Sequence, residues 1–166
     1  SMQKLLDSTK DAYEHKVTIE WLLNELLPFC SYVDADPVPK IVSLEHVHHL
    51  GTEVAGQLSS PPCSILELVN ALHPTPAVGG DPQTEALTII KRVEGIDRRR
   101  YAGPVGWLAA DGDGEFAVGI RSAEVKANTA RLYAGVGLVE DSDPQSELEE
   151  TEAKFKTMLN TFLSTT

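Results

Sequence analysis

The sequence lacks the features of several common protein classes. It has no apolar run near the ~18 residues that a membrane span needs, and only two cysteines, Cys30 and Cys63, outside any CxxC pair. Isolated cysteines are typical of reduced, cytosolic thiols. Lys and Arg total 14 against 25 Asp and Glu, a net charge of −11, which argues against a nucleic-acid backbone or an anionic membrane as a partner. We therefore expect a cytoplasmic protein that binds neither.

The motifs of several common enzyme mechanisms are also missing. There is no GxSxG, no P-loop and no GxGxxG, which argues against a serine nucleophile and against nucleotide chemistry. No internal repeat or low-complexity segment is present. The 166 residues are 42% hydrophobic and 23% charged, enough for one domain with a core. We interpret residues 1–2 as a cloning remnant and residues 3–166 as this domain.

Apolar periodicity predicts a mixture of helices and strands. The loop at 73–82 contains too much proline and glycine for regular structure, and it either lines a pocket or only connects two helices. Residues 111–114 are predicted to form a hairpin turn. A period near 3.6 predicts helices over 9–27, 64–72, 83–94 and from about 147 to the C-terminus, and strands are predicted at 41–44, 105–109, 116–123 and 131–139.

Acidic pairs stand in the first turns of the first and last predicted helices. Glu147, Glu150 and Lys154 share one helical stripe, and Asp11 and Glu14 are placed in the same way relative to the apolar stripe of the first helix. If the two helices dock, four carboxylates converge, and a divalent cation such as Mg²⁺ relieves their repulsion. Alternatively, these are solvated acids that complement the helix dipoles.

An arginine and a pair of glycines suggest an anion-binding side of the same site. Gly135 and Gly137 share one face of the predicted third strand and leave its backbone accessible. Arg121 has only Gly119 and Ala123 beside it on its own face, so its guanidinium can reach a carboxylate and bind it with two hydrogen bonds. The alternative for Arg121 is a surface salt bridge.

Three closely spaced histidines, His46, His48 and His49, follow the short strand at 41–44. Their HxHH pattern does not supply a recognised zinc geometry. We therefore expect one histidine that contacts a ligand, and no zinc site.

Six blocks of the sequence resemble the chorismate-utilising enzymes, most closely the isochorismate synthases of siderophore or menaquinone biosynthesis. The blocks occur in the family's order and span nearly the whole chain, but they cover only the C-terminal part of the family's catalytic domain. They are residues 10–15 (KDAYEH), 72–82 (LHPTPAVGGDP), 101–107 (YAGPVGW), 120–123 (IRSA), 134–137 (AGVG) and 147–154 (ELEETEAK).

The resemblance implies a role for each matching position. Glu14 and Glu150 match the family's principal Mg²⁺ ligands, with Asp11 and Glu147 assisting directly or through water. The groups that match substrate-binding positions are Arg121, the backbone N–H of Gly135, Lys154, His49 and, as a weaker match, Tyr101.

Two further positions favour one subclass. Relatives that amidate chorismate, such as anthranilate synthase, carry Thr where this chain has Ala77 and Lys where it has Gln83. Both differences favour the enzymes that add water to chorismate, with Ala77 lining the substrate site. Salicylate or anthranilate synthase, and a non-catalytic acidic binding module, remain alternative interpretations.

The implied reaction adds water at C2 of chorismate and expels the C4 hydroxyl to give isochorismate. This needs a base to activate water and an acid to protonate the leaving group, and in the family a lysine and a glutamate upstream of the first block supply them. We therefore expect a fragment that is inactive alone. The implied fold is the C-terminal portion of an α/β sandwich with antiparallel sheets and outer helices. We expect self-association through the apolar surface and strand edges that truncation exposes.

Overall fold

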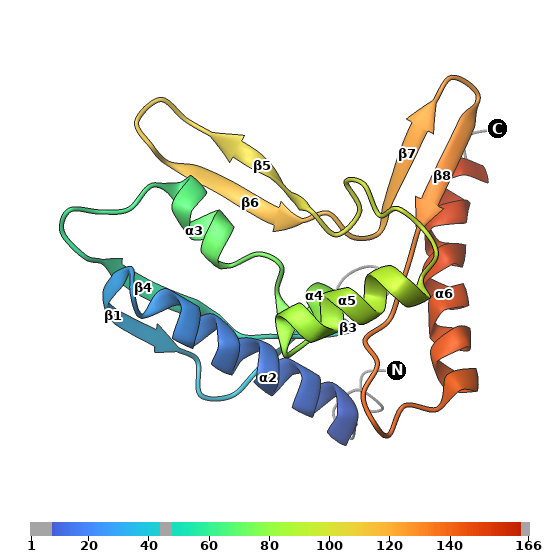
Figure 1. The fold of residues 1–166 in the computed structure, drawn as a ribbon, viewed down its shortest axis with the longest axis horizontal. Helices are drawn as coiled ribbons and strands as arrows, with labels where there is room; N and C mark the ends of the chain where they lie inside the picture. The colour runs from blue at the N-terminus through green and yellow to red at the C-terminus, as the bar shows by residue number, and fades with distance from the viewer. Residues whose placement is uncertain (1–7, 44–47, 164–166) are drawn as a thin grey trace.

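The computed structural model describes residues 8–43 and 48–163 as an α+β fold (Figure 1). Leu44, His46 and the interpreted cloning remnant lie outside the described residues. The helices are α2 (Thr9–Leu26), α3 (Ile65–Ala71), α4 (Pro76–Gly79), α5 (Gln83–Val93) and α6 (Pro144–Leu163). The strands are β1 (Cys30–Ala35), β2 (Lys40–Ser43), β3 (His48–Gly51), β4 (Val54–Leu58), β5 (Pro104–Leu108), β6 (Gly114–Val118), β7 (Ser122–Lys126) and β8 (Thr129–Tyr133).

The four predicted helices are confirmed, and side-chain caps define the starts of α2, α3 and α6. The Ser8 side chain accepts a hydrogen bond from the Asp11 backbone N–H at 3.1 Å, and Ser64 and Glu67 form a reciprocal capping box. At α6 the Asp143 carboxylate accepts from the backbone N–H of Ser146 at 2.8 Å. This cap starts α6 three residues before Glu147 and therefore places Glu147 within its first turn.

The Pro/Gly-rich loop contains a short helix, α4, so the prediction of no regular structure at 73–82 was wrong. Pro76 occupies the first turn of α4, where the missing backbone N–H costs nothing. The Gly79 N–H donates to the Thr75 carbonyl at 2.8 Å. Gly80 then ends the helix with a positive φ of 76°, a conformation that glycine adopts readily.

Every strand of the described residues belongs to a two-stranded antiparallel sheet. The pairs are β1–β4, β2–β3, β5–β6 and β7–β8. The predicted strand at 41–44 is confirmed as β2 and the hairpin turn at 111–114 as the β5–β6 connection. Three strands, β1, β3 and β4, were not predicted. The β2–β3 hairpin lies within the sequence that joins β1 to β4, so β1 and β4 depend on pairing at a distance, whereas β3 pairs with the strand just before it.

Two predicted strands are shorter than expected. The strand predicted at 116–123 is divided between β6 and β7, and Arg121 lies between them with a positive φ of 48°. Such a backbone cannot continue a strand, so Arg121 does not share a strand face with Gly119 and Ala123. The strand predicted at 131–139 ends as β8 at Tyr133, and Gly135 and Gly137 lie in the following segment.

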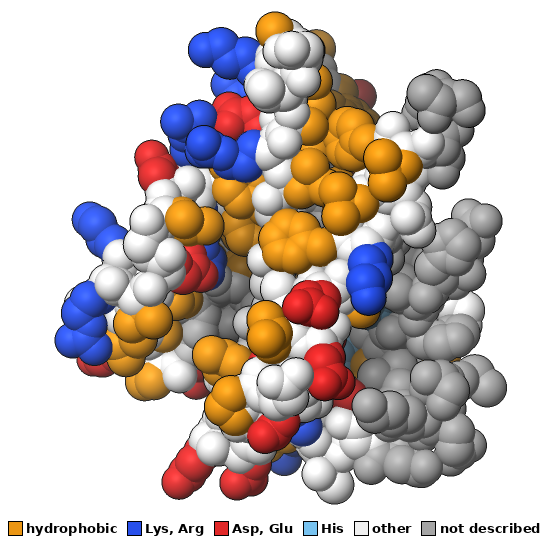
Figure 2. Space-filling view, turned by 90° about the vertical axis from the view of Figure 1, so that its right-hand side faces the viewer, with side chains coloured by type: hydrophobic (Ala, Val, Ile, Leu, Met, Phe, Trp, Pro, Cys, Tyr) orange, Lys and Arg blue, Asp and Glu red, His pale blue; other side chains and the backbone are white. Residues whose placement is uncertain are grey.

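The fold buries little of its apolar surface. Among the described residues only Gly79, Ala102, Tyr133 and Glu147 are less than 9% exposed. The accessible surface is 12,050 Å², against about 8,000 Å² for a compact monomer of 18.0 kDa. Trp107 is 55% and Leu138 74% exposed, and Figure 2 shows hydrophobic side chains gathered over the middle and upper parts of one face. The predicted exposure of apolar surface is confirmed.

The chain between β8 and α6 brings the first turn of the last helix to the first turn of α2. In Figure 1 it descends from the β7–β8 hairpin, passes the N-terminal end of α2 and turns into α6. The first turns of α2 and α6 therefore lie near each other. Within the described ranges, the structure contains no helix long and apolar enough to cross a membrane.

Candidate active site

Gly137 brings the chain after β8 directly against the Glu14 side chain. A Cβ placed on Gly137 would lie 3.1 Å from Oε2 of Glu14 and 3.3 Å from its Oε1, closer than ordinary contact. The backbone of Gly137 does not have the positive φ that favours glycine. Glycine therefore favours close approach here, because its missing Cβ lets the α2 carboxylate pack directly against the backbone.

Lys10, Glu14 and Glu147 form the centre of the site, which we term the carboxylate cluster. The Lys10 ammonium donates a hydrogen bond to Oε1 of Glu147 and lies 3.6 Å from Oε1 of Glu14. Glu147 is 6% exposed. Two buried oxygens of the cluster, Oε1 of Glu14 and Oε2 of Glu147, have no hydrogen-bond partner. The predicted convergence of the first and last helices is thus confirmed for Glu14 and Glu147.

Charge and burial perturb the titration of the cluster. Burial lowers the pKa of Lys10, but the hydrogen bond to Glu147 and the charges of Glu14, Glu147 and Glu150 outweigh it, so the pKa is raised. Burial also raises the pKa of Glu14; Asp11 and Glu147 add to this rise, and Lys10 opposes it. These shifts place Asp11 and Glu150 within electrostatic reach of the cluster.

Lys154 connects α6 to the glycine segment. Its Nζ lies 2.7 Å from Oε1 of Glu150 and donates to the backbone carbonyl of Gly135 at 3.1 Å. The predicted stripe of Glu147, Glu150 and Lys154 therefore faces the chain after β8. One predicted metal ligand, Glu150, is paired with a lysine of its own helix.

A tyrosine pair closes the Gly135 side of the site. The rings of Tyr101 and Tyr133 stack with centroids 5.1 Å apart and planes 12° from parallel. A Cβ on Gly135 would lie 3.1 Å from the Tyr101 hydroxyl. The buried Tyr133 hydroxyl has no hydrogen-bond partner. Sequence reasoning missed Tyr133, because a tyrosine at the end of a strand carries no distinctive pattern.

Arg98 links the Tyr101 ring to the loop that carries Ala77. The Arg98 guanidinium lies 5.9 Å from the ring centroid and donates to the carbonyl of Val78 at 2.7 Å. Burial raises the pKa of the Tyr101 hydroxyl; Arg98 opposes this and Glu94 adds to it. Ala77 itself is exposed on α4. Arg98 was not predicted, because it follows the end of α5 and no helical spacing distinguishes it from its neighbours Arg99 and Arg100.

Arg121 and His49, predicted separately, lie together. Nη2 of Arg121 is 2.8 Å from Nε2 of His49. A guanidinium only donates hydrogen bonds, so Nε2 of His49 accepts and carries no proton in this contact. The bend between β6 and β7 therefore meets the β2–β3 hairpin through these two side chains. Among the ion pairs of the described residues none involves Arg121, so the alternative of a surface salt bridge is not observed there, and the side chain contacts His49 instead.

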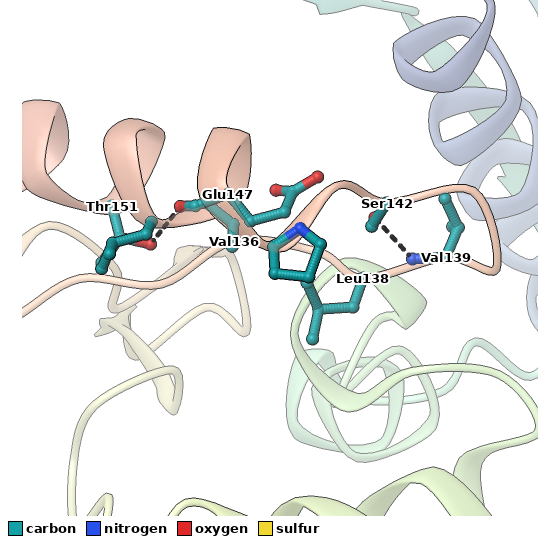
Figure 3. Close-up of a pocket in the computed structure, with 8 residues that line it drawn as sticks. Val136, Leu138, Val139, Ser142, Glu147 and Thr151 are labelled. Atoms are coloured by element: carbon teal, nitrogen blue, oxygen red, sulfur yellow. Dashed lines mark hydrogen bonds between the residues drawn. The ribbon is translucent and has the colours of Figure 1, made fainter.

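A pocket of about 390 Å³ adjoins the carboxylate cluster on the α6 side. In Figure 3 the chain after β8 forms one wall and the first turns of α6 form the other, with Glu147 among the lining residues. Ser142 accepts a hydrogen bond from the Val139 N–H at 3.0 Å and fixes the turn between the walls. The lining residues are Val136, Leu138, Val139, Ser142, Pro144, Glu147, Leu148 and Thr151.

The carboxylates supply the ligand chemistry of a hard divalent cation, although they are not gathered into a complete set. In the part of the chain that the structure describes, no three His, Cys, Asp or Glu side chains are arranged to hold a metal ion. The unpartnered oxygens of Glu14 and Glu147 fit a cation, because buried carboxylate oxygens are otherwise hydrogen-bonded or coordinate metals.

Fold and site together define an α+β protein in which α2 and α6 place carboxylates and lysines against the glycine-containing segment after β8. The sequence matches the chorismate binding enzyme family over residues 1–163. The chain belongs to this family, and the resemblance noted above is confirmed.

Individual relatives agree in both sequence and structure. The chain is 45% identical over 156 residues to the isochorismate synthase DhbC of Bacillus subtilis (strain 168), covering 94% of this chain and 39% of that protein. It is 43% identical over 157 residues to isochorismate synthase MenF of the same strain, covering 95% and 33%.

A solved structure confirms the fold class. DhbC from Bacillus anthracis, assigned as a 2,3-dihydroxybenzoate-specific isochorismate synthase, matches with a TM-score of 0.91 and 48% identity. The match covers 95% of this chain and 42% of that one. The chain therefore spans less than half the length of the relatives that it resembles.

Proposed function

We propose that this chain is the metal- and carboxylate-binding part of an isochorismate synthase. The observation that carries the proposal is the carboxylate cluster, packed against Gly137 with Lys154 and the tyrosine pair beside it. Relatives that share 43–48% identity with the chain are named isochorismate synthases. The free Cys30 and Cys63 suit the cytoplasm, where we place the enzyme.

Glu14, Glu147 and Glu150 would hold Mg²⁺, with Asp11 close enough to assist. Their oxygens are of the type that Mg²⁺ prefers, and two of them lack partners in the structure. When bound, the ion neutralises the carboxylate on the substrate ring.

The residues around the cluster would hold the anionic substrate. Lys154 presents an ammonium group beside Gly135, and the Tyr101 hydroxyl lies over the same glycine. Arg121 supplies a guanidinium that His49 orients, suited to gripping a carboxylate with two hydrogen bonds. We assign to this chain the binding and orientation of chorismate. Ala77 would line the substrate site from α4. Arg98 links this helix to Tyr101, because it donates to the Val78 carbonyl and lies over the Tyr101 ring.

The reaction that we propose for the whole enzyme adds water at C2 and removes the hydroxyl at C4. The base and the acid are assigned to upstream segments, as the family resemblance implies. The protein at full natural length should therefore convert chorismate to isochorismate with Mg²⁺, and the 166 residues alone should not. Normal turnover by the 166 residues alone would refute the assignment of the base and the acid to upstream segments.

Product analysis and substitution test the proposal against its alternatives. Chromatography of the full-length reaction should show isochorismate; salicylate or anthranilate would assign another subclass. In the full-length protein, Glu14→Gln and Glu150→Gln should each weaken Mg²⁺ binding by about tenfold or more, because a first-sphere carboxylate is lost. A non-catalytic acidic module predicts no effect on metal binding measured by calorimetry.

A further inference from the structure

Lys10 lies between the two helices and contacts a carboxylate of each. It lies one helical turn before Glu14 on α2, and its ammonium group reaches across to Glu147 on α6. Glu147 is more than nine-tenths buried, and its second oxygen, Oε2, faces no donor. A lysine that bonds one buried carboxylate and lies 3.6 Å from another holds the position that a cation would take.

Buried carboxylates without a cation repel each other and lose hydration. The electrostatic neighbours of Lys10 are Glu14, Glu147 and Glu150. Its ammonium therefore compensates part of the negative charge that two docking helices bring together. Lys10 has the length and flexibility for this role, because its four-carbon stem carries a compact point charge.

We propose that Lys10 is a tethered countercation, which stabilises the metal-free cluster and competes with the divalent ion for Glu14 and Glu147. This inference rests on the proposed metal site. A divalent ion that binds both carboxylates must displace the ammonium. Because the Lys10 side chain is 28% exposed, it can swing toward water without repacking a core. Lys10 would thus lower metal affinity while it raises the stability of the empty site.

The charge balance supports this competition. Four carboxylates (Asp11, Glu14, Glu147, Glu150) and two ammonium groups (Lys10, Lys154) leave two net negative charges in the region. Without the Lys10 ammonium the same region carries three, so removal of this charge should strengthen the binding of a divalent cation.

The experiment compares Lys10→Met with a matched lysine on the same helix. Methionine keeps an unbranched apolar stem and removes the charge. Lys16 provides the control: its Nζ lies 3.6 Å from Oε1 of Glu20, with the two side chains 70% and 62% exposed, so Lys16→Met removes a surface ion pair of α2. Both variants are made in the 166-residue chain and in the full-length protein.

Two measurements should move in opposite directions. Lys10→Met should lower Tm in EDTA by a few degrees, since about 1 kcal/mol shifts Tm by 2–4 °C in a protein of this size. It should also bind Mg²⁺ about tenfold more tightly in calorimetry, because one like charge near a site has an effect of this order. Lys16→Met should change neither quantity. A purely structural ion pair predicts instead that both stability and metal affinity fall.

Lys10→Arg keeps the test decisive if the methionine variant does not fold. A guanidinium grips carboxylates more firmly, so this variant should bind Mg²⁺ more weakly than the wild type and should melt higher in EDTA. Unchanged Mg²⁺ affinity in either Lys10 variant overturns the role of Lys10 while leaving the proposed function intact. Failure of all the proteins to bind Mg²⁺ overturns the inference together with the metal site. Chorismate turnover by the full-length protein, measured separately, then tests the proposed activity.

Discussion

At Gly137 the chain passes so close to Glu14 that a side chain would meet the carboxylate, with contacts of 3.1–3.3 Å from a Cβ to the carboxylate atoms. The neighbour that would have to move is the flexible end of a glutamate. A methyl group at this position would therefore displace the carboxylate by a few tenths of an ångström and leave the backbone in place. Gly137 has no side chain that could bind a ligand, but its contact with Glu14 determines where the carboxylate lies.

We predict that Gly137→Ala weakens Mg²⁺ binding by about tenfold, the lower range for residues that orient metal ligands. The backbone at this position does not require glycine, so thermal unfolding should change little. Calorimetry for the metal and circular dichroism for Tm measure the two effects. A variant that binds Mg²⁺ like the wild type would show that Glu14 is not held by this contact.

At the scale of the element, the α3 capping box gives a defined pH dependence. The Glu67 carboxylate accepts hydrogen bonds from the backbone N–H and the hydroxyl of Ser64, both at 2.8 Å. These bonds lower the pKa of Glu67 below its ordinary value of 4.5. A carboxyl whose pKa is lower in the folded protein adds stability above its ordinary pKa, and this stability is lost as the pH falls through the lowered value.

Glu67→Gln should therefore lower Tm near neutral pH, and the difference from the wild type should shrink as the carboxylate of the wild type is protonated in acid. Thermal melts followed by circular dichroism from about pH 7 to about pH 3 measure this difference. Glu85 in the first turn of α5 offers a control, because α5 has no side-chain cap hydrogen bond. A constant difference at all pH values would mean that Glu67 acts only through packing.

The helices could be predicted from the sequence because each one carries its own apolar stripe and start signal. The strands β1 and β4 could not, since they pair with each other across the intervening β2–β3 hairpin. The strand β3 was missed because its four residues are too few to show a period of two. The bend at Arg121 was also unpredictable. A positive φ in a non-glycine residue is decided by tertiary contacts such as the one with His49.

The candidate site was predictable in part. The spacing of the acidic residues indicated that Glu14 and Glu147 would meet, and the structure confirms it. The position of Lys10 between them was not indicated, because a lysine near the start of a helix is ordinary on any exposed surface. Only the docking of α6 shows which cation faces the carboxylates.

At the scale of the whole molecule, the surface area has a direct consequence for solution behaviour. The protein exposes about 4,000 Å² more than a compact monomer of its mass, including apolar side chains on unpaired hairpins. Open strand edges and apolar patches of this kind promote association. The excess is larger than the 1,200–2,000 Å² that a specific interface buries.

We therefore predict that the 166-residue chain self-associates. Multi-angle light scattering should give a mass above the 18.0 kDa of the monomer, rising with concentration. Trp107→Lys, at a 55% exposed position of β5, should reduce the associated fraction, because a charge opposes burial of that hairpin. A stable monomer at all concentrations would contradict the prediction.

The contact between Lys10 and Glu147 joins residues 137 positions apart. Hairpins and helices form within microseconds, whereas contacts between distant segments follow once the intervening chain is ordered. The carboxylate cluster is consequently completed late in folding, when the two end helices meet. Capture of the proposed divalent ion would then require this last step, so metal binding would distinguish fully folded chains from chains whose end helices have not yet docked.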